Sequence, residues 1–248
     1  LQRLQTDYID LYQLHWPDRA TNFFGELNYS HQPEKSGIPI LETLEALKEL
    51  VDEGLIRYVG LSNEVPWGVM KFLSYAEALG LPRVVTVQNP YNLLNRKDEL
   101  GLTEVLLREK VDLLAYSPLA FGTLSGKYLD DSAGPDARIN QFPRFSRYFT
   151  DNGLKATAEY VQLARDHGLD PAQMALAFVN SRPFIGSNII TGLNKLGITN
   201  ILAVGDLSDG HKFKNLAVCD YRDYLDYEDF IERVMANDQF AEPIEAIF

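Results

Sequence analysis

The stretch YIDLYQLHWPD, from Tyr8 to Asp18, indicates how the rest of the chain is organised. Its first half is a run of bulky apolar residues interrupted only by Asp10 and Gln13, which is typical of a parallel strand covered on both faces. The run ends at His15, so an ionisable imidazole lies where strand becomes loop. In a (β/α)8 barrel, chemistry is placed at this carboxyl-terminal rim. Taken alone, the stretch still favours a hydrogen-bonded core histidine over a catalytic one.

The composition argues against several classes of partner. The 248 residues carry a net charge of −12, which disfavours nucleic acid and anionic membranes because phosphates would be repelled. No apolar run approaches the length of a membrane span, and we expect no signal segment. Cys219 is the single cysteine, which fits a reducing cytoplasm. The chain starts at Leu1, and we expect it to begin inside a domain.

Strand-like apolar runs alternate with amphipathic helical runs, as βα units produce. After the first strand, we predict strands at 56–61, 84–88, 111–116 and 185–191. We predict helices from 39 to a stop at 54, from 66, and at 99–110, 154–167 and 171–180. A polar loop from about 19 to 37 is too long for a simple connector and is expected to shape a binding site. No G-x-G-x-x-G follows any strand, so a barrel is favoured over a doubly wound dinucleotide-binding sheet.

Polar side chains stand at the end of each predicted strand. Asn63 follows the second strand, Gln88 ends the third, and Tyr116 ends the fourth. Asn63 either reaches a ligand or caps the helix that starts near Pro66. The residues alone leave both interpretations open.

Two later segments have an open role as anion sites. The turn from Gly122 to Lys127 can cradle phosphate oxygens with its backbone N–H groups, although an ordinary flexible loop is the simpler interpretation. Arg138, Arg144 and Arg147 lie among aromatic residues and form either an anion clamp or a solvated face.

Five motifs follow one another in order along the chain: LQTDYIDLYQLHWPD, IRYVGLSNE, VTVQNPYNLLNR, LLAYSPLAFGTLSGKY and DPAQMALAFV. Together they resemble one known family, the aldo-keto reductases, in the branch with the bacterial Tas-like oxidoreductases and the potassium-channel β-subunits. The resemblance covers about Leu1 to Ile190. It implies an α/β (β/α)8 barrel that binds NADPH in an extended form and reduces aldehydes or ketones.

The resemblance also implies roles for individual residues. His15 matches the histidine of the family's Asp, Tyr, Lys and His set, where it orients and polarises the substrate carbonyl. Tyr116 matches the aromatic residue that packs beside the nicotinamide. The groups that hold the nicotinamide carboxamide are matched by Ser62, Asn63 and Gln88. The loop that closes over the cofactor pyrophosphate is matched by Ser117, Leu119, Gly122, Leu124, Gly126 and Lys127.

The family's Asp, Tyr and Lys have no counterpart in this sequence, because the resemblance begins at the fourth strand. We therefore expect residues 1–190 to form a partial barrel of about five of eight βα units, within a fragment or altered product of a longer protein. Acid catalysis is typically worth roughly 10²–10⁴-fold, so little or no reductase activity is expected of the isolated chain. Open sheet edges would invite a protein partner or an oligomer.

The substrate is expected to be a small carbonyl compound, with no nucleic acid, membrane or metal involved. An apolar mouth suits a hydrophobic or aromatic carbonyl. Its predicted side chains are Trp16, Phe23, Phe24 and Tyr29.

Residues 191–248 are predicted to form a divergent α/β tail. Strand-like runs at 201–204 and 216–219 stand where the family has one helix, so a preference for NADPH over NADH is implied by the resemblance alone. The tail faintly resembles the opening half of a dual-specificity phosphatase, but Leu225 stands where the nucleophile loop needs an arginine six residues after Cys219. Cys219 is expected to be buried, and the acidic residues from 220 to 229 a solvated face.

Two functional hypotheses therefore remain. The first is an NADPH-dependent carbonyl reductase. The alternative is a non-catalytic, barrel-derived binding or regulatory protein.

Overall fold

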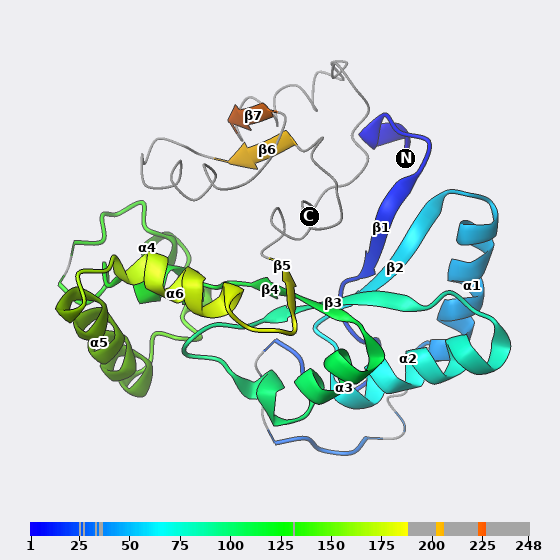
Figure 1. Cartoon of the computed structure of the whole chain (residues 1–248), viewed down its shortest axis with the longest axis horizontal. Coiled ribbons are helices and arrows are strands. Elements are labelled where there is room, and N and C mark those ends of the chain that lie inside the picture. The colour runs from blue at the N-terminus through cyan, green and yellow to red at the C-terminus, as the bar shows by residue number, and fades with distance from the viewer. Residues whose placement is uncertain are drawn as a thin grey trace.

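The computed structural model describes residues 1–24, 26, 28–32, 34, 37–130, 132–187, 202–205 and 223–226. Five parallel strands form one sheet in sequence order (Figure 1), and each strand pairs with the next. This confirms the predicted α/β class and is consistent with an incomplete (β/α)8 barrel. The strands are β1 (Ile9–Leu14), β2 (Ile56–Ser62), β3 (Val84–Pro90), β4 (Asp112–Tyr116) and β5 (Ile185–Ser187).

Helices connect successive strands, and α1, α2 and α3 lie along one side of the sheet (Figure 1). The single helix predicted at 99–110 is wrong, because Gly101 divides it into a short 3-10 turn and a helix. The helices are α1 (Ile40–Asp52), α2 (Pro66–Leu79), α3 (Leu102–Glu109), α4 (Arg138–Gln141), α5 (Asp151–Asp166) and α6 (Pro171–Asn180). The 3-10 turns are η1 (Gln2–Leu4), η2 (Lys97–Leu100), η3 (Ala120–Ser125) and η4 (Pro143–Phe145).

Helix starts follow the expected chemistry at α5 and α6 but not at α2. The side chains of Thr150 and Asp170 accept hydrogen bonds from backbone N–H groups of the first helical turn. At α2 the N-cap residue is Val65, and no side chain caps the helix. Asn63 is therefore not a helix cap, and its side chain is free for the contacts described below.

The main core lies between the sheet and helices α1 to α3. Its strand residues include Val59, Val87 and Leu113, each 0% exposed. Leu44 of α1 and Phe72 of α2 belong to the same apolar cluster. A second, smaller cluster under the segment after β4 contains Ala120, Leu124, Tyr148 and Ala175.

The opposite face of the sheet carries a row of small and polar side chains. A Cβ atom placed on Gly60 would lie 2.4 Å from Thr86 Oγ1 and 3.0 Å from Gln13 Cγ, so these three positions meet on one face. Side chains alternate along a strand, so the residues two positions further share this face. These residues are His15, Ser62 and Gln88, and they form the next row at the carboxyl ends of the strands.

The described part of the tail is a separate two-stranded parallel sheet of β6 (Leu202–Gly205) and β7 (Asp223–Asp226). The strand predicted at 201–204 is thus present within one residue, whereas the predicted run at 216–219 and Cys219 lie outside the described residues. The strand β7 falls within the acidic stretch, where none was predicted. Among the described residues, no helix has both the length and the apolar character needed to span a membrane.

Candidate active site

Asn63 links the ends of three strands. Its Nδ2 donates to the carbonyl oxygen of His15 at 2.8 Å, and the hydroxyl of Tyr116 donates to its Oδ1 at 2.6 Å. Its backbone N–H donates to the carbonyl oxygen of Gln88 at 2.9 Å. The residue has φ 56°, a left-handed conformation that asparagine adopts more readily than most residues. The structure therefore brings His15, Gln88 and Tyr116 to one edge of the sheet.

Ser62 completes this connection but has little hydrogen-bonding capacity left. Its Oγ donates to the carbonyl oxygen of Gln88 at 2.8 Å and accepts from Asn63 Nδ2 at 3.1 Å. Both Ser62 and Asn63 are buried. The side-chain amide of Gln88 is half-buried and, within the described part of the chain, has no hydrogen-bond partner. Of these amides, that of Gln88 is therefore the best placed to bind a ligand's carboxamide.

Tyr116 lies half-buried at the end of β4. Burial raises the pKa of its phenol, and the nearby guanidinium of Arg147 partly offsets the rise. The phenol therefore stays neutral and donates to Asn63 throughout the physiological range. The Nη1 atom of Arg147 is buried and has no hydrogen-bond partner among the described residues.

The segment after β4 is folded on itself. Ser117 has φ 53°, and its carbonyl oxygen accepts from Asn92 Nδ2 at 2.9 Å. The side chain of Leu124 is 1% exposed and belongs to the smaller core, so only its main chain can meet a ligand. Leu119 is partly buried against the same core. Backbone N–H groups that already donate within the segment are those of Ala120, Gly122, Leu124 and Gly126.

Two glycines shape the surface beside Lys127. A Cβ atom at Gly122 would lie 3.2 Å from Lys127 Cε and 3.4 Å from its Nζ, and the φ of +89° further disfavours a side chain. At Gly126, with φ +85°, a Cβ atom would lie 3.1 Å from Val161. Gly122 thus lets the ammonium of Lys127 lie close to the main chain of the turn, and Gly126 lets the turn pack closely against α5. A cradle of this kind suits an anionic group.

Arginines stack on aromatic rings next to this turn. Arg138 lies over Phe145 at 4.7 Å, Arg144 over the same ring at 5.1 Å, and Arg147 over Phe121 at 5.9 Å. None of the three forms an ion pair with another described residue. Arg138 and Arg144 are exposed and Arg147 is half-buried, an arrangement that fits an anion clamp and a solvated face equally.

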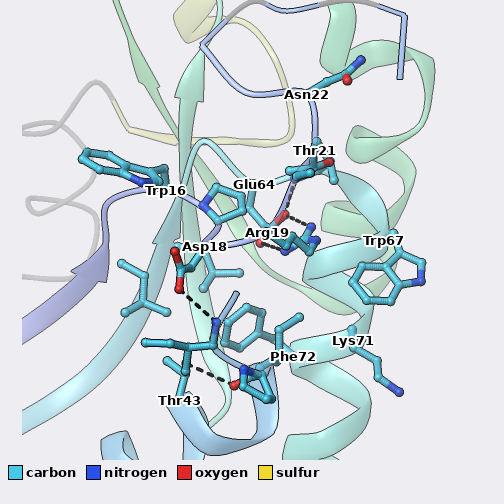
Figure 2. Close-up of a pocket in the computed structure, with 18 of the residues that line it drawn as sticks. Trp16, Asp18, Arg19, Thr21, Asn22, Thr43, Glu64, Trp67, Lys71 and Phe72 are labelled. Atoms are coloured by element: carbon cyan, nitrogen blue, oxygen red, sulfur yellow. Dashed lines mark hydrogen bonds and ion pairs between the residues drawn. The ribbon is translucent and has the colours of Figure 1, made fainter. Parts of the chain in front are cut away.

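A pocket of about 1170 Å³ lies between the β1–α1 loop and helices α1 and α2 (Figure 2). Of the predicted site residues, only His15 and Ser62 line it. The ring centroids of His15 and Trp16 are 4.4 Å apart, and Phe24 lies 6.3 Å from His15. Phe23 packs against Phe24 at 5.1 Å. Aromatic rings therefore lie beside the imidazole, which is itself exposed, and Tyr29 lines the same pocket.

An ion pair that sequence patterns did not reveal forms part of the pocket wall. Arg19 and Glu64 approach to 2.6 Å and lie, in Figure 2, between Trp16 and Trp67. Their separation of 45 positions leaves no local pattern that links them. The one available signal was the position of Glu64, directly after two polar residues at a strand end.

The comparisons with known proteins were made against families, curated relatives and solved structures. The model of the family described as "Aldo/keto reductase family" matches residues 1–210. Protein tas of Escherichia coli is 55% identical over 190 residues, which cover 77% of this chain and 55% of that protein. An aldo-keto reductase of Babesia bovis is 36% identical over 228 residues, covering 82% of this chain and 80% of the relative. A probable voltage-gated potassium channel subunit beta of rice (Oryza sativa subsp. japonica) is 30% identical and covers 79% of this chain and 55% of that protein.

Among solved structures, the glycerol dehydrogenase of Gluconobacter oxydans is similar with a TM-score of 0.52 and 28% sequence identity. The similarity covers 72% of this chain and 48% of that enzyme. The chain thus spans about half the length of Protein tas and of this enzyme.

Proposed function

The chain belongs to the aldo/keto reductase family, and on this premise we propose that it takes part in the NADPH-dependent reduction of aldehydes or ketones to alcohols. The observation that carries the proposal is the meeting of His15, Asn63, Gln88 and Tyr116 at one edge of the parallel sheet. In barrels of this kind, the carboxyl ends of the strands are where catalysis takes place.

The residues of the rim fit the proposed cofactor in charge and shape. The half-buried amide of Gln88 offers a donor and an acceptor for a carboxamide, and the ring of Tyr116 offers a flat apolar face. The cradle of Gly122 and Lys127 suits a pyrophosphate. Ser62 and Asn63 would support the site mainly by holding Gln88 and Tyr116, because most of their own donors are already used. Ser117, Leu119, Leu124 and Gly126 would contribute by holding the shape of the loop, because the N–H groups of Leu124 and Gly126 already donate within it.

When bound, NADPH supplies the hydride that reduces the carbonyl carbon. His15 would donate a hydrogen bond to the carbonyl oxygen and orient it, so that negative charge developing there is stabilised. The aromatic rings beside His15 are themselves partly exposed, so they would offer apolar contact area to a substrate. The wall of rings suits a hydrophobic or aromatic carbonyl substrate.

The first test is cofactor binding by the 248-residue chain. Titration with NADPH should quench tryptophan emission with a dissociation constant below about 1 mM, equivalent to about −4.1 kcal/mol. Lys127→Ala should weaken this binding, whereas Lys155→Ala, on helix α5, should not. NADH should bind more weakly if the arginines bind the additional phosphate of NADPH. Absence of quenching at millimolar NADPH would refute the proposal for this chain.

Steady-state turnover separates the two hypotheses about the chain. No residue matches the family's Asp, Tyr and Lys, so we expect the 248-residue polypeptide assayed by itself to reduce carbonyl compounds slowly. Cofactor binding without turnover would favour the alternative, a binding or regulatory role. That alternative is supported by the large aromatic side chains of Tyr12 and Tyr58, which are 40% and 57% exposed on the first two strands. Turnover at an ordinary enzyme's rate would refute this alternative role.

A further inference from the structure

A buried ion pair joins the base of the long β1–α1 loop to the end of β2. The guanidinium of Arg19 donates two hydrogen bonds to the carboxylate of Glu64, at 2.6 Å from Nη2 and 3.0 Å from Nη1. The side chain of Glu64 is 3% exposed and that of Arg19 is 16% exposed. A double hydrogen bond of this kind fixes the relative orientation of the two groups as well as their distance.

Helix α2 is shaped to receive this pair. The ring of Trp67 lies over the guanidinium of Arg19 at 4.9 Å. A Cβ atom at Gly68 would lie 2.3 Å from the Glu64 carboxyl carbon and 2.5 Å from Arg19 Nη2. Only glycine therefore fits at position 68 while the pair keeps its geometry. The backbone N–H of Val65 donates a further hydrogen bond to Glu64 at 2.8 Å.

The pair is one of the attachments that hold the segment carrying the histidine. Asn63 binds the carbonyl oxygen of His15 at 2.8 Å, and its neighbour Glu64 binds Arg19. Two consecutive residues after β2 thus hold both ends of the segment from His15 to Arg19. Without the ion pair, the far end of the segment would keep the exposed hydrogen bond from the backbone N–H of Ile38 to Asp18 but would lose its buried attachment.

We propose that Arg19 and Glu64 are positioning residues for His15, holding its imidazole at the mouth of the site through the segment from His15 to Arg19. The inference rests on the proposed function, in which His15 orients the substrate carbonyl. A displacement of about 1 Å at such a group can cost on the order of a hundredfold in rate. Loss of the pair should therefore weaken carbonyl recognition more than cofactor binding.

The two tryptophans of the chain, Trp16 and Trp67, both line this pocket and provide the readout. In a Trp67→Phe background, Trp16 is the only indole, and labelling with 5-fluorotryptophan gives one ¹⁹F signal. Arg19→Met keeps the aliphatic stem but removes both hydrogen bonds. The ¹⁹F signal should then move toward that of the free amino acid, and quenching by acrylamide should rise about twofold as the segment loosens.

Two further variants test the cause of this change. Arg19→Lys retains the charge without the double hydrogen bond and should give an intermediate ¹⁹F shift. Arg57→Met removes the ion pair with Asp10 at the other end of the same two strands and should leave Trp16 unchanged. If Arg19→Met abolishes folding, as judged by circular dichroism, the double variant Arg19→Met/Glu64→Met replaces it, because no buried charge is then left unpaired.

A functional readout uses 4-nitroacetophenone, a ketone that quenches tryptophan, added in the presence of saturating NADPH. Its affinity should fall about tenfold in Arg19→Met, while NADPH affinity, followed by nucleotide fluorescence, should stay the same. If the Trp67→Phe protein itself binds no ketone, the proposed carbonyl reduction fails, and the ¹⁹F shift alone decides the positioning inference. A folded Arg19→Met protein with an unchanged ¹⁹F signal, or with unchanged ketone affinity, would overturn it.

Discussion

The same two strands, β1 and β2, are joined by an arginine–carboxylate pair at each end, in contrasting surroundings. At the amino ends, Arg57 and Asp10 lie 2.6 Å apart, and their side chains are 53% and 24% exposed. At the carboxyl ends, Arg19 and Glu64 also lie 2.6 Å apart, but their side chains are 16% and 3% exposed. The two pairs share a chemistry and a shortest distance, but the pair at the carboxyl ends is buried and has two hydrogen bonds where the other has one.

Each arginine is also covered by an aromatic ring. Arg57 lies 3.8 Å from the ring of Tyr8, and Arg19 lies 4.9 Å from that of Trp67. The exposed pair exchanges easily with water and contributes little to stability. The buried pair is costly to break because one charge would be left unpaired away from water. The comparison teaches that an ion pair fixes local geometry where burial raises the free energy of every alternative arrangement.

Neutralising Glu64 should have the largest effect on this comparison. Glu64→Gln leaves the guanidinium of Arg19 without a charged partner and should lower the free energy of unfolding by about 3–5 kcal/mol. The matched change at the amino ends, Asp10→Asn, should leave the urea midpoint within experimental error. Both midpoints can be measured by circular dichroism. Equal shifts for the two variants would remove the distinction between the ends.

Filling the space at Gly68 should have the next largest effect. Gly68→Ala places a Cβ atom 2.3 Å from the Glu64 carboxyl group and should destabilise the fold by about 1–3 kcal/mol, as overpacking does. In an ordinary helix interior the same change would stabilise by roughly 0.5–1 kcal/mol. The sign of the change in urea unfolding is therefore diagnostic. Gly134→Ala, where nothing lies within 4 Å, is the control.

Removing the hydroxyl of Tyr116 tests how much an uncharged hydrogen bond, the one to Asn63, stabilises the carboxyl ends of the strands. Tyr116→Phe leaves the buried Oδ1 of Asn63 without this donor and should cost about 1–3 kcal/mol. Tyr58→Phe, at an exposed position on β2, should cost nothing measurable. Thermal or urea unfolding at neutral pH can compare the two variants.

The same tyrosine predicts an alkaline dependence with a defined sign. Burial raises the pKa of Tyr116 above its ordinary value of 10.0, so the unfolded chain ionises first as pH rises. Its contribution to stability is complete below pH 10 and is lost as pH climbs toward the folded pKa. The stability of Tyr116→Phe should fall less steeply over this interval. Parallel pH profiles for the two proteins would contradict the assignment.

Neutralising Asp98, a second buried carboxylate near the carboxyl ends of the strands, should have the smallest effect on stability. The change should be a gain in stability, whereas neutralising Glu64 causes a loss. Asp98 has an amide partner, Asn89, and no ion pair among the described residues, and burial raises its pKa, with Asn89 and the charge of Lys97 partly offsetting the rise. Its negative charge therefore lowers stability at neutral pH, by contrast with the charge of Glu64. Asp98→Asn should raise the free energy of unfolding by about 1 kcal/mol or less, helped by the unpaired Oδ1 of Asn89 as an acceptor for the new amide.

The sign for Asp98 follows from its raised pKa. Below its ordinary value of 3.8 the side chain is protonated in both states, so the difference between wild type and Asp98→Asn should shrink there. It should grow as pH rises through the folded pKa and then level off. Urea unfolding between acidic and neutral pH measures this course, and destabilisation at neutral pH would refute it.

Sequence patterns predicted the features that depend on near neighbours. The alternation of strands and helices, the rim position of His15 and the start of α6 at Asp170 all follow from local periodicity and capping. The division of the third helix at Gly101 was missed, and a single glycine inside a helical pattern is often tolerated. Asn63 had two equally local interpretations, and only the structure removed the capping one.

The features that sequence patterns missed depend on distant partners. Arg19 and Glu64 are 45 positions apart, and a charged residue in a polar loop is ordinarily exposed to solvent. The requirement for glycine at position 68 becomes visible only when both side chains are in place. The hydrogen bond between Ser62 and Asn63 could not be predicted either. Serine and asparagine suit ligand binding whether or not their hydrogen-bond donors are already used.

The long loop after β1 has a narrow base. A Cβ atom at Gly37 would lie 1.4 Å from the carbonyl oxygen of Asp18, and the backbone N–H of Ile38 donates to the Asp18 carboxylate at 2.9 Å. Insertions between these two anchor points would lengthen a closed loop, which costs only about 0.6 kcal/mol per doubling of its length. The part of the segment that follows Arg19 can therefore diversify during evolution, or be replaced by grafting, while the barrel strands beneath it keep their register.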